Sequence, residues 1–254
     1  MSFQAAVIVA AVIIFASAIL LFSRFVTGRI QAKEEQIKHE AATRGWTFEK
    51  VHERGYRIYR FKGTTEGVAW EAESAQLVAG GDSRQKRRHV ARWHGRWSPG
   101  VNGPMVCLGV PKGKEVMSTS FAQGDGFFAR MAVKAAGFAF DKAVDVYFGK
   151  EIGDQIDAGA MRRVETPAVP GFIVMAANVD EGSRILSEGL QRALMDASSE
   201  PNNLLGENDR PYVLVRPQGI SLARMKMFRD IKELEQFIRA GIGLTRAFRF
   251  GRRA

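Results

Sequence analysis

The chain contains 254 residues, of which 46% are hydrophobic and 25% are charged, and its formal net charge is +10. This composition is that of an ordinary globular protein and excludes a wholly disordered or fibrous chain. The single cysteine, Cys107, excludes an intramolecular disulfide framework and any metal site built from several cysteines. The positive charge is concentrated in residues 24–100 (net +7) and 161–254 (net +4), which favours contact with an anionic surface.

The N-terminal segment is the clearest feature of the sequence. Residues 1–23 contain no charged side chain, and the 20 residues from 3 to 22 are nearly all apolar. A helix of this length spans about 30 Å, the hydrocarbon thickness of a bilayer, so we predict a transmembrane anchor over residues 1–23. A signal peptide cleaved after Ala18 is the alternative. We favour a retained anchor because no basic residue precedes the apolar run and four more apolar residues follow Ala18.

Basic residues that follow the apolar stretch set the predicted topology, and these are Arg24, Arg29 and Lys33. Positively charged flanks stay in the cytoplasm, so the N-terminus is expected outside and the C-terminal domain inside, at a bacterial inner membrane. Residues 24–45 are predicted to form a helical stalk that ends at Gly45. We favour a solvated stalk over a coiled coil, because two heptads are too few to support the latter.

Residues 46–120 alternate with period two, which predicts an antiparallel β-rich subdomain in the form of a sheet or small barrel. Five short strands are expected, at residues 46–51, 56–61, 67–72, 90–97 and 105–110. We expect the side chains of Trp46 and Trp70 to be buried on this sheet. Residues 121–165 are predicted to be a helical connector with one long helix over 127–148 that ends at Gly149.

Residues 166–254 are predicted to form an α+β subdomain in the order strand, helix, hairpin, helix. The elements are a strand at 171–176, a helix over 183–197 capped by Asp180, a hairpin at Pro217 and Gln218, and a final helix that begins at Asp230. We expect Phe172 and Leu234 to be buried. The predicted fold class of the whole chain is therefore α+β.

This layout resembles bacterial membrane proteins of uncharacterised function that have one N-terminal span and a cytoplasmic α+β domain. The resemblance rests on the anchor, the segment Arg44-Gly45-Trp46, the glycine-rich strand pair at 63–70, and the strand–helix–hairpin–helix ending. It includes no diagnostic motif. It implies a fold and a location for this chain, and no activity.

Residue types that carry chemistry are present without the spacing that chemistry needs. The four histidines (His39, His52, His89 and His94) and Cys107 do not have zinc-ligand spacing, so no metal is predicted. The glycine segments at 100–103, 109–114 and 124–126 lack the features of a phosphate loop and are interpreted as turns. No cofactor is indicated and no catalytic residue can be assigned.

The basic segment, residues 84–96, is the predicted working surface. It contains six cationic residues and no acid, and these are Arg84, Lys86, Arg87, Arg88, Arg92 and Arg96. A solvated loop leading into a strand is the alternative. Anionic lipid is favoured over nucleic acid because the domain is tethered near a negatively charged leaflet and no nucleic-acid-binding motif accompanies the cations.

The sequence therefore predicts a membrane-anchored cytoplasmic binding or scaffolding protein that contacts anionic lipid and protein partners of unknown identity. Two alternatives stay open. One is an enzyme whose site is assembled from scattered residues, and the other is nucleic-acid binding through the basic segment. The sequence does not indicate an oligomeric state.

Overall fold

The computed structural model describes residues 3–53, 56–77, 89–109, 144–145, 147–157, 159–165, 168–198, 210–224, 228 and 230–250. The chain divides into two compact units, Met1–Thr47 and Phe48–Ala254. A long helix dominates the first unit, and a large antiparallel sheet with several helices forms the second. The fold is α+β, as predicted.

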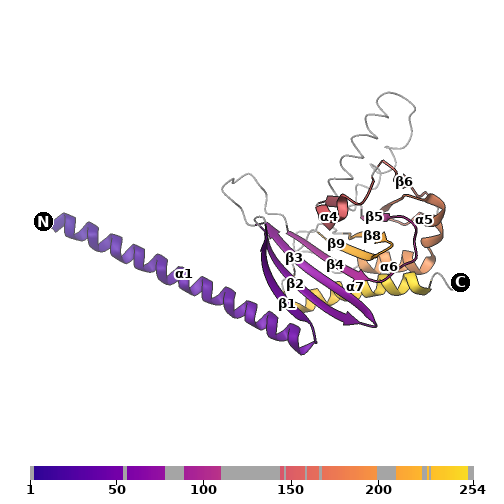
Figure 1. Ribbon diagram of the computed structural model, residues 1–254. Coiled ribbons are helices and arrows are strands. Elements are labelled where there is room, and N and C mark those ends of the chain that lie inside the picture. The colour runs from indigo at the N-terminus through magenta and orange to yellow at the C-terminus, as the bar shows by residue number, and fades with distance from the viewer. Residues whose placement is uncertain are drawn as a thin grey trace, which may run out of the picture. The chain divides into compact units, whose positions relative to one another are not determined.

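The first unit consists mainly of helix α1 (Phe3–Thr43), which is one continuous helix of 41 residues (Figure 1). The helix ends at a glycine, as predicted. Gly45 has a φ of +72°, and its N–H donates to the carbonyl of Ala42 at 2.9 Å. Glycine adopts this left-handed conformation without a Cβ clash and so closes the last turn. Among the residues whose side chains the structure describes, which leave out most of residues 3–22, no helix is long and apolar enough to cross a membrane.

The second unit is built on one nine-stranded sheet with the order β1-β2-β3-β4-β9-β8-β5-β7-β6. The strands are β1 (Thr47–Glu53), β2 (Tyr56–Thr65), β3 (Val68–Leu77), β4 (His89–Arg96), β5 (Met105–Gly109), β6 (Arg162–Arg163), β7 (Phe172–Ala176), β8 (Tyr212–Arg216) and β9 (Gly219–Arg224). From β2 to β6 every neighbouring pair is antiparallel. The five strands predicted before residue 111 are all present. Strands from residues 46–120 and 166–254 share this one sheet.

Helices cover one face of the sheet. The helices that the structure describes in this unit are α4 (Lys150–Gly153), α5 (Val179–Ile185), α6 (Glu188–Ser198) and α7 (Ile231–Phe250). Helix α7 packs on β4, β9 and α6, and Figure 1 shows α6 and α7 on the opposite side of the sheet from α4. The apolar side of α7 is buried, through Ile231, Leu234, Phe237, Ile238 and Ile242.

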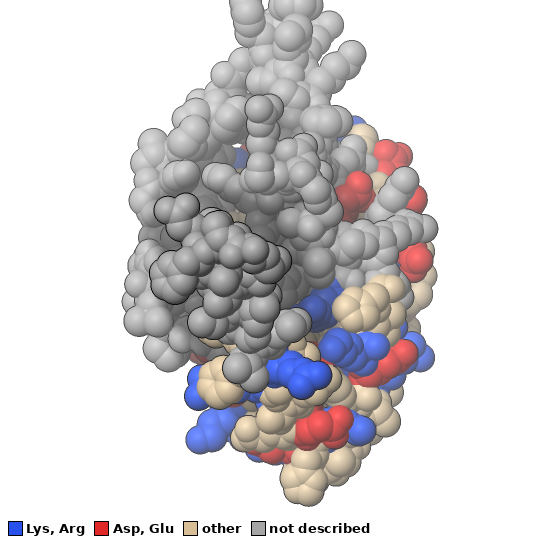
Figure 2. Space-filling model, turned by 90° about the vertical axis from the view of Figure 1, so that its left-hand side faces the viewer, with Lys and Arg blue, Asp and Glu red and all other residues tan. Residues whose placement is uncertain are grey.

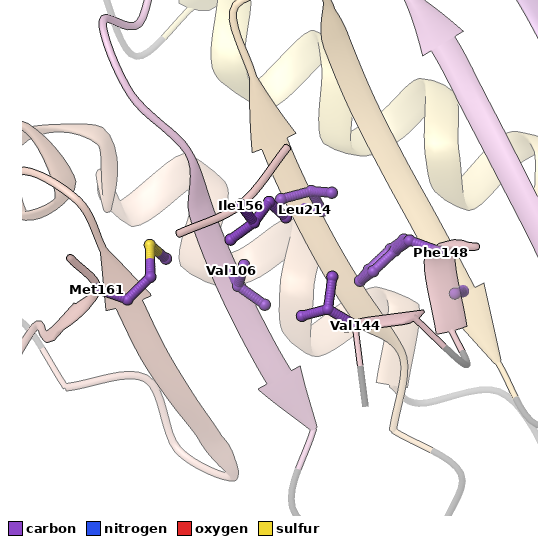
Figure 3. Packing of buried hydrophobic residues seen from close by; sticks show 7 residues of the cluster. Val106, Val144, Phe148, Ile156, Met161 and Leu214 are labelled. Atoms are coloured by element: carbon purple, nitrogen blue, oxygen red, sulfur yellow. The ribbon is translucent and has the colours of Figure 1, made fainter. Parts of the chain in front are cut away.

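An apolar cluster covers the other face at the centre of the sheet. Val106 of β5 and Leu214 of β8 lie on adjacent strands, and Ile156 and Phe148 lie over them (Figure 3). As a result, β8 and β9 are buried on both faces, and nearly every residue in them is inaccessible to solvent. The predicted helix over 127–148 lies largely outside the described residues. Gly149, with a φ of +94°, ends its described turn as predicted.

The predicted helix over 183–197 is wrong in its extent, because the chain forms two helices that break at Leu186 and Ser187. The predicted cap is also wrong. Asn178 caps α5, since its Oδ1 accepts a hydrogen bond from the Glu181 N–H at 3.0 Å, whereas Asp180 lies within the first turn. Asn is as good a cap as Asp, so the side chain one position before the helix takes the role.

Three of the four side chains predicted to be buried are buried. Trp70 is 3% exposed, Phe172 is 8% exposed and Leu234 is 1% exposed. The prediction for Trp46 is wrong, because this side chain is only partly buried. Trp46 lies between the end of α1 and the start of β1, and the guanidinium of Arg44 stands 5.8 Å from its ring centroid.

The start of α7 gives a direct test of capping. The Glu233 N–H donates to Asp230 Oδ1 at 2.9 Å, as the sequence predicts for an N-cap. Replacing Asp230 by Ala leaves this N–H without its partner and should lower the free energy of unfolding by about 1 kcal/mol. Denaturant titration of the full chain in a neutral detergent measures the change. Asp230→Asn keeps an acceptor and should match the parent, and equal losses in both variants would contradict the capping role.

Candidate functional site

Charged and polar side chains from neighbouring strands share one face of the sheet. Alternate residues of a strand point to the same face, so the pairing registers show which side chains lie together. His94 of β4 lies opposite Ser221 of β9, and His94 Nδ1 stands 3.0 Å from Ser221 Oγ. In the next row, Arg96 of β4 lies opposite Gly219 of β9, which in turn lies opposite Arg216 of β8.

Toward β2 the same face carries a ladder of ion pairs. Arg60 Nε lies 2.9 Å from the Glu71 carboxylate, and its Nη2 lies 3.7 Å from that of Glu73. Lys62 Nζ lies 3.6 Å from Glu71. Oppositely charged residues across neighbouring strands stabilise the pairing of those strands. The cations and carboxylates of this ladder therefore neutralise one another.

Arg92, one of the six cations of the basic segment, belongs to this ladder. Its Nη1 lies 2.6 Å from Glu73 Oε1, and its Nε donates to the carbonyl of Tyr147 at 2.7 Å. The side chain is 24% exposed. Its guanidinium thus links β3, β4 and the backbone at residue 147, and the side chain is partly buried.

The row that contains Arg96 and Arg216 has no such balance. Arg216 is 8% exposed, and its Nη1 donates to the neutral Oε1 of Gln155 at 2.9 Å. Its buried Nε has no hydrogen-bond partner among the residues described here. Within the same described residues neither Arg96 nor Arg216 forms an ion pair. Two positive charges therefore lie in one row of the sheet, and neither is paired with a described carboxylate.

These charges act on the histidine between the ladder and the arginine row. Burial, with the positive charges of Arg216 and Arg96, lowers the pKa of His94 from 6.5 to about 4. A hydrogen bond to the backbone of Ile220 opposes this shift. Burial also lowers the pKa of Arg216 below its ordinary value. At neutral pH His94 is therefore uncharged. The positive charge at this place in the sheet comes from Arg96 and Arg216.

A Ser–His nucleophile is the enzymatic interpretation of this geometry, and three observations argue against it. Ser221 is 3% exposed, so its hydroxyl is not reachable by a substrate. The pKa of His94, about 4, is far from the neutral value that suits a general base. Glu71 lies opposite His94 in the register, but its carboxylate is occupied by Arg60 and Lys62. The arrangement is therefore better suited to binding than to acyl transfer.

Cys107 is a small buried side chain in the core of the sheet. It is 0% exposed on β5, and burial raises the pKa of its thiol to about 12. The thiol is the poorly nucleophilic form at neutral pH, which argues against a Cys-based reaction. Among the described side chains, no group of three His, Cys, Asp or Glu residues could hold a metal ion.

The remaining predicted site residues lie in the basic segment and on α1. Arg84, Lys86, Arg87 and Arg88 lie outside the described residues, whereas Arg96 is described and exposed. The topology-setting residues Arg24, Arg29 and Lys33 are exposed on α1. Figure 2 shows Lys and Arg interspersed with Asp and Glu over the described part of one face of the molecule. The described part of that face thus has no single field of positive charge.

One buried carboxylate has a structural role that sequence reasoning missed. Glu181, 7% exposed, accepts hydrogen bonds from the backbone N–H of Asn102 at 3.0 and 3.1 Å and from its side-chain amide at 3.2 Å. The glycine segment at 100–103 therefore already holds an anion, the side chain of Glu181. This contact agrees with the interpretation of that segment as a turn.

Sequence reasoning also missed Arg216, Ser221 and Gln155. The predicted hairpin at Pro217 and Gln218 was a usable signal, because a two-residue turn places Arg216 opposite Gly219. Nothing local indicates that β9 pairs with β4, which is the pairing that brings Arg96 to this row. Comparison of the chain with protein-family models, with curated proteins and with solved structures found no match.

Proposed function

We propose that the protein is a membrane-anchored binding or scaffolding protein, with α1 inserted in a bacterial inner membrane and residues 48–254 on the cytoplasmic side. The observation that carries the proposal is the uncharged, apolar sequence of residues 3–22 within one continuous helix. These 20 residues are long enough, at about 30 Å, to cross the hydrocarbon core. Of their side chains the structure describes only Phe15 and Phe22.

The described aromatic side chains of α1 support this proposal. Phe15 is 69% exposed, Phe22 is 70% exposed and Phe25 is 57% exposed. Leaving apolar surface in water costs about 25 cal/mol per Å², a cost that lipid removes. The guanidinium of Arg29 lies 4.5 Å from the ring centroid of Phe25, a pairing suited to the headgroup region at the end of an anchor.

Fractionation tests the anchor. The full chain is expected to stay in the membrane pellet after extraction at alkaline pH, because this treatment removes only peripheral proteins. Deletion of residues 2–22 should leave only peripheral contact with lipid, so the same alkaline extraction should then release the protein to the soluble fraction. A matched variant in which residues 3–22 are all Leu keeps length and apolarity and should return to the pellet. Release of the full chain by alkaline extraction would contradict the anchor.

The proposal includes contact between the basic segment and anionic headgroups, through Arg84, Lys86, Arg87, Arg88 and Arg96. Each basic residue close to an anionic leaflet adds about 1 kcal/mol of attraction. Arg92 is left out, because its guanidinium is bonded to Glu73 and to the carbonyl of Tyr147. Arg96 is exposed and contributes from the end of β4.

Charge replacement tests this contact. The chain without residues 2–22 should bind vesicles that contain anionic lipid, and binding should weaken as salt shortens the Debye length to about 8 Å. Replacing Arg84, Lys86, Arg87 and Arg88 by Gln should weaken binding by at least about 100-fold, which follows from roughly 1 kcal/mol per residue. The matched control replaces four exposed arginines elsewhere by Gln, namely Arg162, Arg184, Arg192 and Arg239. Equal losses in the two variants, or stronger binding to RNA at the same salt, would refute lipid contact.

A further inference from the structure

The row of Arg96 and Arg216 is a second charged feature, separate from the anchor and from the ion-pair ladder. Both arginines point to the same face of the sheet, and Gly219 stands between them on the intervening strand. Strands in a sheet are about 4.8 Å apart, so the two Cα atoms are about 10 Å apart. Gly219 has no side chain, and a Cβ there would overlap the carbonyl oxygen of Gly95 and touch the ring of His94, so no side chain of β9 separates the two arginines.

In the described part of the chain, the cations of the adjacent ladder are paired with carboxylates, whereas those of this row are not. In the ladder each described cation meets a carboxylate, as Arg60 meets Glu71 and Arg92 meets Glu73. No described carboxylate forms an ion pair with Arg96 or with Arg216. The same sheet face therefore contains a neutral region and, one row further along β4, a positive one.

The burial of Arg216 is the main evidence for an anion-binding role of this row. A buried charge without an opposite charge is strongly unfavourable, and proteins rarely contain one. Arg216 is 8% exposed, its Nη1 bonds to a neutral amide oxygen of Gln155, and its Nε has no partner among the described residues. A bound anion would supply both the missing charge and the missing hydrogen-bond acceptor.

The row can be reached from solvent. Arg96 is exposed at the end of β4, and the turn residues Pro217 and Gln218, which follow Arg216, are exposed as well. His94 lies one row deeper on the same face and is held by Ser221. A ligand would therefore approach from the hairpin end of the sheet, where Arg96 lies at the surface and Arg216 is buried.

We propose that Arg96 and Arg216, with His94 beside them, bind the phosphate group of a ligand. A guanidinium presents a planar fork of donors that matches phosphate oxygens in pairs. A phosphate group has more oxygens and more negative charge than a carboxylate, so it is the better partner for two guanidinium groups from different strands. The group has two sources, a soluble phosphate compound and a phospholipid headgroup. The site does not depend on the proposed anchor.

Binding is tested on the full chain in a neutral detergent at pH 7 and constant ionic strength. Inorganic phosphate should bind saturably, raise the thermal midpoint and shift the ring resonances of His94. Arg96→Gln and Arg216→Gln should each weaken binding by at least tenfold. Arg239→Gln removes one exposed charge that pairs with Glu235 on α7, and this control should bind phosphate like the parent. Arg96 has no described ion pair to lose, so Arg96→Gln remains informative if Arg216→Gln does not fold.

The two sources are separated by a second titration with phosphatidic acid in mixed micelles. Tighter binding of the micellar lipid than of inorganic phosphate, with the same dependence on Arg96, identifies a headgroup. The reverse order identifies a soluble phosphate compound. The proposal is overturned if phosphate leaves the thermal midpoint and the His94 resonances unchanged, if Arg96→Gln binds like the parent, or if Arg239→Gln loses as much affinity as Arg96→Gln.

Discussion

Replacing Trp93 by Ala is expected to lower the free energy of unfolding by about 3–5 kcal/mol. Trp93 is 0% exposed and lies on the face of β4 that α7 covers. A Cβ placed on Gly241 of α7 would overlap its indole ring, and so would a Cβ on Gly95 of β4. The ring is therefore held between the helix backbone and the sheet. Truncation leaves a cavity that two rigid elements cannot easily close.

The glycines of α7 provide a matched pair of substitutions for this contact. Gly241→Ala places a methyl group against the Trp93 ring and should destabilise the protein by about 1–3 kcal/mol. At Gly243 nothing lies within 4 Å of the position that a Cβ would take, so Gly243→Ala should instead stabilise the helix by about 0.5–1 kcal/mol. Denaturant titration measures both. If the two variants change stability in the same direction, Trp93 does not pack against Gly241 in this way.

The stability of the protein should fall as the pH is lowered from 6.5 toward 4, with His94 as a main cause. The pKa of His94 is about 4 in the folded chain against 6.5 for the ordinary group. Between pH 4 and 6.5, His94 is protonated in the unfolded chain and neutral in the folded chain. The free energy of unfolding therefore rises with pH across this window. For His94 alone the difference amounts to roughly 3 kcal/mol.

Substitution of single histidines isolates this effect. His94→Gln cannot titrate, so its stability should depend less on pH between 6.5 and 5, a range in which most carboxylates stay ionised. The control is His52→Gln, because His52 is exposed on β1 and the same substitution there should leave the slope of the parent unchanged. Parallel stability curves for His94→Gln and the parent would show that His94 is not a buried, uncharged group in the folded chain.

Local patterns predict local structure well in this chain. The alternation of residues 46–110 predicts the strands, and Asp230 and Gly45 mark helix ends that the structure confirms. The break between α5 and α6 was not predictable in this way. Leu186, Leu190 and Leu194 are all buried at a spacing of four residues, so the helical period runs without a gap across the break.

The candidate site was harder to predict because its partners are far apart in the sequence. Arg92 and Arg96 belong to one basic segment, and strand alternation puts both on the same face. Arg92 is paired with Glu73 because β4 lies beside β3. Arg96 lies in the row of Arg216 because β9 joins β4 to β8. A single sequence carries no local signal for those pairings.

The orientation of the chain in the membrane tests the central proposal most directly, and thiol labelling measures it. Cys107 is buried, with a thiol pKa of about 12, so a cysteine introduced at the surface is the reactive one. In spheroplasts, a maleimide that cannot cross membranes should label Ser2→Cys and should label Gln218→Cys only after the membrane is opened. Gln218 is an exposed turn residue. Labelling of Gln218→Cys in intact spheroplasts would contradict a cytoplasmic domain on a membrane anchor.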